Sequence, residues 1–237
     1  MLIQQESLLG QLMTVRGPIE VEAMGITLPP EHLLLYHTPD DIVLSDSDLG
    51  IEELMVYAQA GGGKTLVELT NRGLRRDARG LRLISESTGV NVVMGCGYYK
   101  APWHPPDMDE KTVETITTEM IKDITEGVDG SGIIGEIGVS SLTDNEEKVV
   151  IASAHAQQET GAAINIHFDI GVEEELRMRV LDILEHKGVD LNCVITSHFH
   201  PHMDEIDYHE RMMERGTYVE YELFGQETLR SPNHAHV

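Results

Sequence analysis

The chain of 237 residues has the length of one large barrel-type domain or two small ones, and its 41% of hydrophobic residues suffices for a sizeable core. Its 41 Asp and Glu residues outnumber its 17 Lys and Arg residues, which gives a formal net charge of −24. This acidic excess argues against partners such as nucleic acid and anionic membrane surfaces, because both require a basic protein surface.

The sequence also indicates a cytoplasmic protein. Residues Met1–Gly25 lack the basic segment followed by an apolar block that marks a signal peptide, and no run approaches the ~20 apolar residues needed to span a bilayer. Cys96 and Cys193 lie in apolar, strand-like runs, so we expect reduced core cysteines and no disulfide framework.

Predicted strands and helices alternate along the chain. After a hairpin or lead-in strand over Leu12–Val21, apolar runs predict strands over Gly25–Leu35, ending at Pro29-Pro30, and over Thr65–Thr70, Val90–Tyr99, Gly132–Ser140, Ala163–Phe168, Asn192–Ser197 and Thr217–Phe224. Helical spacing of apolar residues predicts helices over Asp41–Ala60, Asp77–Thr88, Glu110–Thr125, Thr143–Thr160, Glu173–His186 and Ile206–Glu214.

Some local signals are more detailed. In Asp77–Thr88 the residues Leu81, Leu83 and Ile84 are expected to face the core, and Thr143 with Glu146 forms a capping-box pattern. The Pro-rich segment Ala101–Met108 is expected to be a loop, and residues 231–237 a frayed tail.

The strand–helix order and the near-continuous apolar strands predict an α/β fold, with a parallel sheet and helices outside it. Seven such strands are visible, whereas a closed (β/α)₈ barrel has eight. A doubly wound open sheet is the structural alternative, although no Gly-rich dinucleotide fingerprint follows a first strand.

One glycine-rich stretch imitates a nucleotide site. Ala58–Thr65 (AQAGGGKT) fits a relaxed P-loop pattern, but a helix precedes it and a strand follows, which is the reverse of the order that phosphate binding requires. We therefore expect these glycines to turn the chain from helix into strand.

Glu136 is the main candidate for chemistry. It lies within the apolar run Gly132–Ser140 (GIIGEIGVS), where a charge is costly unless it is paired or bound to a cation. The run is either an edge strand with Glu136 in water, or a central strand whose carboxylate holds a metal ion.

Other strand ends favour the second interpretation. The residues at these ends are His32, Tyr98 or Tyr99, His167 and His198. Because the carboxyl ends of parallel barrel strands meet at one rim, three imidazoles and a carboxylate would form a site for a divalent metal, most naturally zinc.

Long segments of the chain resemble the phosphotriesterase-related branch of the amidohydrolase superfamily, from about Met13 to Gln226. They read GPIEVEAMGITLPPEHLLL, TLVELTNRGLRRD, VNVVMGCGYY, MIKDITEGVDGSGIIGEIGVSS, TGAAINIHFDIG and YVEYELFGQE. The resemblance implies a TIM-type (β/α)₈ barrel with a two-metal centre. It also implies a zinc-dependent hydrolase that acts on ester, lactone or phosphotriester bonds of small molecules through a metal-activated hydroxide.

The resemblance also implies roles for individual residues. The metal ligands would be His32, Glu136 as the bridging carboxylate, His167, and either His198 or His202. His198 is preferred because a strand cannot easily deliver a residue four positions beyond its tip. Tyr99, with Tyr98 as second choice, would line the pocket, and Glu136 and Tyr99 are the predicted catalytic residues.

Two departures from the family pattern alter the expected site. Pro30 stands where the first histidine of a His-x-His pair is expected, and the aspartate at the end of an eighth strand has no visible counterpart. We therefore expect residues 1–237 to form a single barrel domain truncated after strand seven, holding one or two metal ions.

The truncation has consequences for assembly and activity. Strand edges at Gly25–Pro29 and Thr217–Phe224 would be left open, which favours a homodimer. The alternative function is a degenerate or fragmentary barrel with little or no catalysis that acts through association. A third interpretation is a fragment of a longer gene product.

Overall fold

The computed structural model describes residues 10–36, 43–126, 130–199, 202 and 204–222. A seven-stranded parallel sheet dominates it, and its strands lie side by side in chain order. The strands are β3 (Ile26–Glu31), β4 (Gly63–Glu68), β5 (Asn91–Cys96), β6 (Ile133–Val139), β7 (Ile164–Phe168), β8 (Val194–Thr196) and β9 (Tyr218–Val219). A separate antiparallel hairpin joins β1 (Gln11–Thr14) to β2 (Gly17–Glu20).

A helix connects each pair of successive parallel strands, as in a (β/α) barrel. The helices are α1 (Ser47–Gly61), α2 (Ala78–Thr88), α3 (Val113–Thr125), α4 (Asp144–Thr160), α5 (Glu174–His186) and α6 (Ile206–Glu214). Short 3₁₀ turns are η1 (Val21–Ala23), η2 (Arg72–Leu74), η3 (Ala101–Trp103) and η4 (Leu191–Cys193).

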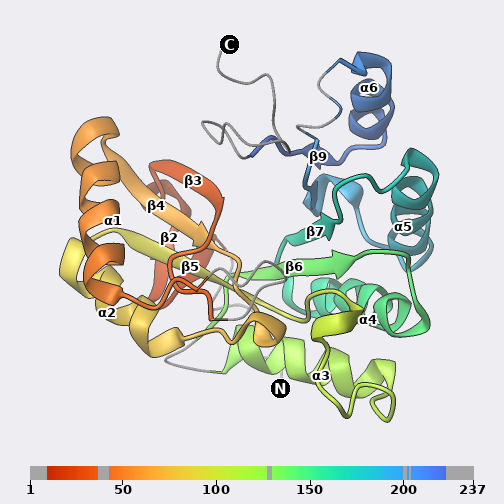
Figure 1. Cartoon of the computed structure of the whole chain (residues 1–237), viewed down its shortest axis with the longest axis horizontal. Helices are drawn as coiled ribbons and strands as arrows, with labels where there is room; N and C mark the ends of the chain where they lie inside the picture. Colours follow the sequence, from red (N-terminus) through yellow and green to blue (C-terminus); the bar gives the residue numbers. More distant parts are fainter. Residues whose placement is uncertain (1–9, 37–42, 127–129, 200–201, 203, 223–237) are drawn as a thin grey trace.

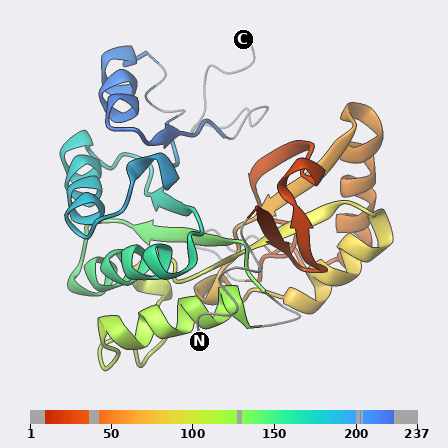
Figure 2. The same cartoon turned by 180° about the vertical axis from the view of Figure 1, so that it is seen from behind.

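The sheet curls into part of a barrel, with helices on its outer side (Figures 1 and 2). In the part of the chain that the structure describes, β3 and β9 form its two edges and do not pair with each other. This arrangement confirms the prediction of an α/β barrel truncated after strand seven.

Two core clusters hold the helices against the sheet. One lies under α1 and α2 and includes Leu54, Leu81 and Ile84, and a larger one lies under α3, α4 and α5. The hairpin closes the amino-terminal end of the sheet, where the Arg16 guanidinium donates to Asn91 Oδ1 at 2.8 Å and the Val15 N–H donates to Val92 O. The carboxyl ends of the strands lie at the other end.

Several element boundaries differ from the prediction. The first helix begins at Ser47 rather than Asp41, because the Asp46 carboxylate accepts from the N–H groups of Asp48 and Leu49 and caps the helix there. Strand β3 runs through both prolines to Glu31, which an edge strand tolerates. The last strand, β9, has two residues, and Phe224 of the predicted strand lies outside the described residues.

Leu83 was wrongly predicted to face the core. It is 51% exposed, whereas Leu81 and Ile84 on the same helix are fully buried. Gly62 adopts the left-handed conformation that ends α1 and leads into β4, so the glycine-rich stretch is a helix terminus, as predicted.

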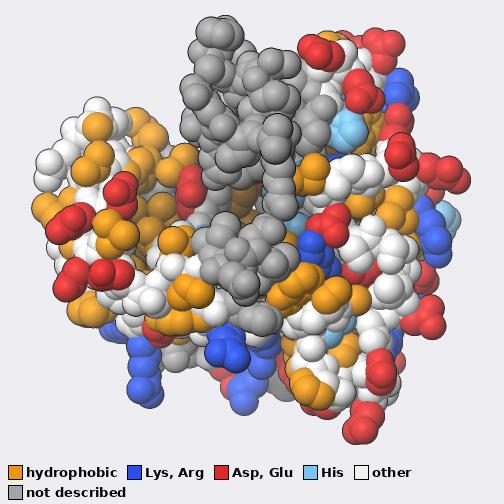
Figure 3. Space-filling view, in the orientation of Figure 1, with side chains coloured by type: hydrophobic (Ala, Val, Ile, Leu, Met, Phe, Trp, Pro, Cys, Tyr) orange, Lys and Arg blue, Asp and Glu red, His pale blue; other side chains and the backbone are white. Residues whose placement is uncertain are grey.

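The two cysteines and the surface charges agree with a reduced, acidic protein. Cys96 is buried, Cys193 is half-buried, and both are free thiols. Acidic side chains spread widely over the face shown in Figure 3, while several Lys and Arg side chains gather at its lower edge. No helix in the described ranges is long and apolar enough to cross a membrane. The predicted frayed tail, residues 231–237, lies outside the described residues.

Candidate active site

His32, His167 and His198, at the carboxyl ends of β3, β7 and β8, lie together with Glu136, which the structure places midway along β6 and not at its carboxyl end. Glu136 Oε2 lies 2.7 Å from His167 Nδ1, and Glu136 Oε1 lies 3.6 Å from His32 Nε2. His198 Nε2 lies 3.2 Å from His167 Nδ1. With Tyr99 these residues form what we call the strand-end cluster.

Glu136 lies in the middle of the sheet and not at an edge. Every residue of β6 is buried, and Glu136 itself is only 6% exposed. Burial alone would raise the pKa of this carboxyl, but positive charge on the imidazoles of His167, His32 and His198 when they are protonated, together with the hydrogen bond from His167, outweighs burial and lowers it. Glu136 is therefore an ionised carboxylate inside the barrel.

His167 is the hub of the cluster. Burial lowers its pKa despite the opposing charge of Glu136, which favours the neutral imidazole. We assign the His167 proton to Nδ1, where it donates to Glu136 Oε2, so that Nε2 accepts from the Tyr99 hydroxyl at 2.9 Å. Both ring nitrogens are then satisfied.

The structure distinguishes between the two tyrosines. Tyr99 packs edge-on against the His167 ring, with ring centroids 4.7 Å apart. The Tyr98 hydroxyl donates instead to the Glu119 carboxylate on α3. The preferred tyrosine, Tyr99, is therefore the one that reaches the cluster.

The two candidate histidines after β8 lie in different surroundings. His198 contacts His167, and its backbone N–H donates to Glu222 Oε1 at 2.7 Å. The His202 ring contacts Glu205 Oε1 at 2.8 Å and packs against Tyr208. His198 is brought into the cluster, and His202 lies against the start of α6.

The His32 ring is held in place by buried polar groups that the sequence analysis did not identify. Its Nδ1 contacts Thr70 Oγ1 at 2.8 Å, and the Thr70 hydroxyl donates to Glu68 Oε1 at 2.6 Å. Glu68 is fully buried, and burial raises its pKa to about 8. This chain of contacts fixes the His32 ring with Nε2 towards Glu136.

The donor set suits a divalent cation by its chemistry, because imidazole nitrogens and a carboxylate are typical zinc ligands. Donor atoms around zinc, with bonds of about 2.0–2.1 Å, lie about 3.4 Å apart at the tetrahedral angle. Here His167 Nδ1 contacts both Glu136 Oε2, at 2.7 Å, and His198 Nε2, at 3.2 Å. In the described ranges, no group of three or more His, Cys, Asp or Glu side chains is arranged to hold a metal ion as it stands.

Other polar side chains gather near this rim. Glu220 is buried beyond β9 and accepts from Asn165 Nδ2 at 3.1 Å. Lys100, directly after Tyr99, forms a close ion pair with Asp169. A cavity of about 560 Å³ lies apart from the cluster at the start of α4, lined by Asp109, Thr143, Asp144, Asn145 and Lys148.

Comparison with known proteins gives consistent matches. The sequence model of the Phosphotriesterase family matches residues 10–237. N-acetyltaurine hydrolase of Xenopus tropicalis is 33% identical over 266 residues, which covers 94% of this chain and 74% of that protein. The human N-acetyltaurine hydrolase is 31% identical over 261 residues, with the same coverage of 94% and 74%.

Solved structures show the same fold. A resiniferatoxin-binding protein from Rhodobacter sphaeroides matches with a TM-score of 0.84 and 34% identity, covering 91% of this chain and 70% of that one. A phosphotriesterase homology protein from Escherichia coli, complexed with phosphate in its active site, matches with a TM-score of 0.79 and 30% identity. That match covers 86% of this chain and 72% of the other.

Proposed function

The chain belongs to the phosphotriesterase family, and from this premise we propose that it is a hydrolase whose reaction takes place at the strand-end cluster. The observation that carries the proposal is a buried, ionised Glu136 in contact with His167 and facing His32 and His198. A buried carboxylate among imidazoles at the carboxyl rim of a barrel is the arrangement expected of a reaction centre.

The bond that we propose is an amide first, and an ester or lactone second. The sequence resemblance predicted ester, lactone or phosphotriester substrates. The curated relatives are named for N-acetyltaurine, whose scissile bond is a carboxamide. Both bond types react by attack of water on an acyl carbon, so the same carboxylate and imidazoles serve either one.

We further propose that Glu136, His167 and His198 hold a divalent ion, most naturally zinc, with His32 beside them. Such an ion would polarise the acyl oxygen and lower the pKa of a water molecule. Glu136 offers a carboxylate oxygen that can accept the proton of the attacking water. Tyr99 contacts His167 Nε2 and is a positioning residue in this scheme, because it fixes the orientation of the ring. With an ion held by Nδ1, the ring proton would lie on Nε2 and be donated to the Tyr99 oxygen.

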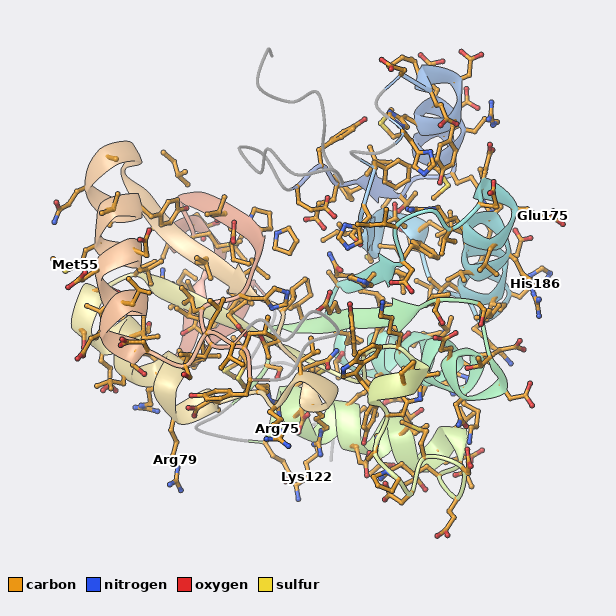
Figure 4. The ribbon with its side chains drawn as sticks, in the orientation of Figure 1. Met55, Arg75, Arg79, Lys122, Glu175 and His186 are labelled. Carbon is orange, nitrogen blue, oxygen red and sulfur yellow. The ribbon has the colours of Figure 1, made fainter. Side chains whose placement is uncertain are left out.

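The test is hydrolysis of N-acetyltaurine, a neutral N-acetyl amine and a simple lactone by the purified chain. We expect Glu136→Gln and His167→Asn each to reduce kcat/KM by about 100-fold or more. His186→Asn is the matched control, because His186 is exposed on the outer side of α5 (Figure 4). The control is expected to retain activity.

Metal content per chain, measured after purification with zinc and dialysis, tests the proposal that the cluster holds a divalent ion. We expect about one equivalent, reduced in His167→Asn and unchanged in His186→Asn. Absence of both metal and turnover would instead favour the alternative of a degenerate barrel that acts through association. That alternative is motivated by Pro30, which offers no ligand, and by the open edges of the sheet.

A further inference from the structure

Lys100 and Asp169 form an ion pair across the rim that carries the strand-end cluster. Lys100 directly follows Tyr99 after β5, and Asp169 directly follows β7, two residues after His167. Between them lies β6 with Glu136, and a Cβ at Gly138 would come within 2.2 Å of the Lys100 backbone nitrogen. The absence of a side chain at Gly138 lets Lys100 lie directly against the central strand.

The Lys100 ammonium is held in a fixed place. Its Nζ lies 5.3 Å from the ring centroids of both Tyr99 and Trp103, a cation–π arrangement that restricts the side chain. The residue is only 8% exposed.

The charges around this rim are otherwise largely acidic. The Glu136 carboxylate lies 2.7 Å from His167 Nδ1, and the Glu222 carboxylate accepts from the backbone N–H of His198 at 2.7 Å. An anionic ligand would meet repulsion from these groups unless a cation compensates it. Arg177 cannot serve, because its guanidinium is fully buried and donates to the carbonyl oxygens of Ser197 and His198.

Exposure differs between the two members of the ion pair. The Lys100 side chain is 10% exposed, whereas the Asp169 side chain is 38% exposed. The carboxylate therefore lies on the solvent side of the ammonium, where an incoming anion could take its place. Replacing one anion by another keeps the buried ammonium paired and avoids the free energy cost of an unpaired charge.

We infer that Lys100 binds an anionic group of the substrate, and that the enzyme selects small N-acyl compounds carrying a carboxylate or sulfonate near the amide. Asp169 occupies that position until the substrate displaces it. The inference rests on the proposed function for the scissile bond, but the ion pair and its exposure are independent of it. The sulfonate of N-acetyltaurine, the compound for which the relatives are named, has this chemistry.

The experiment compares N-acetyl-β-alanine with its primary amide, which has the same shape without the charge. For Lys100→Met, we expect the ratio of kcat/KM for the acid to that for the amide to fall about 10–100-fold, mainly through KM. Lys100→Arg should preserve the preference for the acid. Asp169→Asn should lower KM for the acid, because the competing carboxylate is gone. Lys122→Met, at an exposed position on α3 (Figure 4), is the control and should leave the ratio unchanged.

Binding of the same two ligands, measured by calorimetry, separates this inference from the proposed function. If the wild-type chain binds the acid and Lys100→Met does not, the inference is supported even when neither compound is hydrolysed. Equal losses for acid and amide in Lys100→Met would overturn it, because Lys100 would then be structural. A wild-type chain that prefers the amide, or that binds neither ligand, would overturn it as well.

Discussion

Glu220 shows how the barrel interior changes the chemistry of a single residue. It is buried beyond the short strand β9, and burial together with the neighbouring carboxylates raises its pKa from the ordinary value of 4.5 to about 8. The folded protein therefore keeps Glu220 protonated across a range in which the unfolded chain ionises it. Its contribution to stability is fully present below about pH 4.5 and is lost as the pH rises towards 8.

Glu220→Gln tests this pH dependence. Glutamine can still accept the hydrogen bond from Asn165 but cannot ionise, so the loss of unfolding free energy between pH 5 and pH 8 should shrink by on the order of 2 kcal/mol. Denaturant unfolding at several pH values measures it. Glu175→Gln, at an exposed position on α5 (Figure 4), provides the comparison. Parallel pH profiles for Glu220→Gln and wild type would show that Glu220 titrates normally.

The sequence located only part of this chemistry at the residue scale. His32, His167 and His198 follow from their places at strand ends and Glu136 from its charge within an apolar run, and the structure brings all four together. The spacing of Glu220 and Glu222 was a signal that the sequence analysis did not use, because residues two apart along a strand point to the same face of the sheet. The Lys100–Asp169 pair has no local signal, since 69 positions separate its members.

Helix α4 shows how one element holds two site loops. The Thr143 hydroxyl accepts from Glu146 N at 3.3 Å, and Glu146 Oε2 accepts from Thr143 N at 3.0 Å, which confirms the predicted capping box. Glu146 is fully buried and also accepts from the Ser140 hydroxyl at 2.7 Å and from Ala101 N at 3.2 Å. One carboxylate therefore ties the loops after β5 and β6 to the helix.

Two alanine substitutions should separate capping from loop anchoring. We expect Thr143→Ala to reduce the unfolding free energy by about 1 kcal/mol, as for an ordinary N-cap. Glu146→Ala should reduce it by about 2–4 kcal/mol, because several buried donors lose their acceptor. Urea unfolding measures both, with Thr118→Ala on the exposed side of α3 as the control. Equal losses at positions 143 and 146 would mean that the loops are held without Glu146.

Element boundaries were predictable where a cap residue marks them and uncertain elsewhere. Asp77 and Thr143 cap the starts of α2 and α4 through their side chains, and Gly89 and Gly161 end these helices in the left-handed conformation. The start of α1 was placed too early because several acidic residues precede it, and the sequence does not show that Asp46 is the one that caps the helix. Leu83 was misassigned because a spacing rule does not show how wide the buried face of a helix is.

The curvature of the sheet is a property of the whole molecule that strand counting leaves open. Seven parallel strands allow an open, flat sheet as well as a partial barrel, yet only curvature brings strand ends from β3 and β8 to one cluster. The family resemblance, and not the periodicity, favoured the curved form.

The alignment with the N-acetyltaurine hydrolase of Xenopus tropicalis covers 266 positions, which is more than the 237 residues of this chain. The alignment therefore contains positions at which only the relative has a residue.

Net charge leads to a prediction for the molecule as a whole. With 41 acidic and 17 basic residues, repulsive pairs of charges outnumber attractive ones, and acidic side chains are spread over the face in Figure 3. Monovalent salt screens charges separated by more than about 10 Å at 0.1 M, so it relieves this long-range repulsion. We therefore expect Tm to rise by several degrees between about 10 and 300 mM NaCl.

Local ion pairs have the opposite effect on the salt dependence of Tm, because salt weakens the attraction within each pair. The sign of the change in Tm therefore shows which effect is larger. Arg211 forms two contacts of 2.7 Å with Glu174, and Arg82 contacts Glu86 at 2.8 Å. Salt weakens such exposed pairs, but each contributes only about 0–1 kcal/mol. Thermal scans in NaCl and KCl at equal ionic strength should agree if screening is the cause. A fall in Tm with salt would show that these pairs, and not the net charge of −24, dominate the electrostatic free energy of the fold.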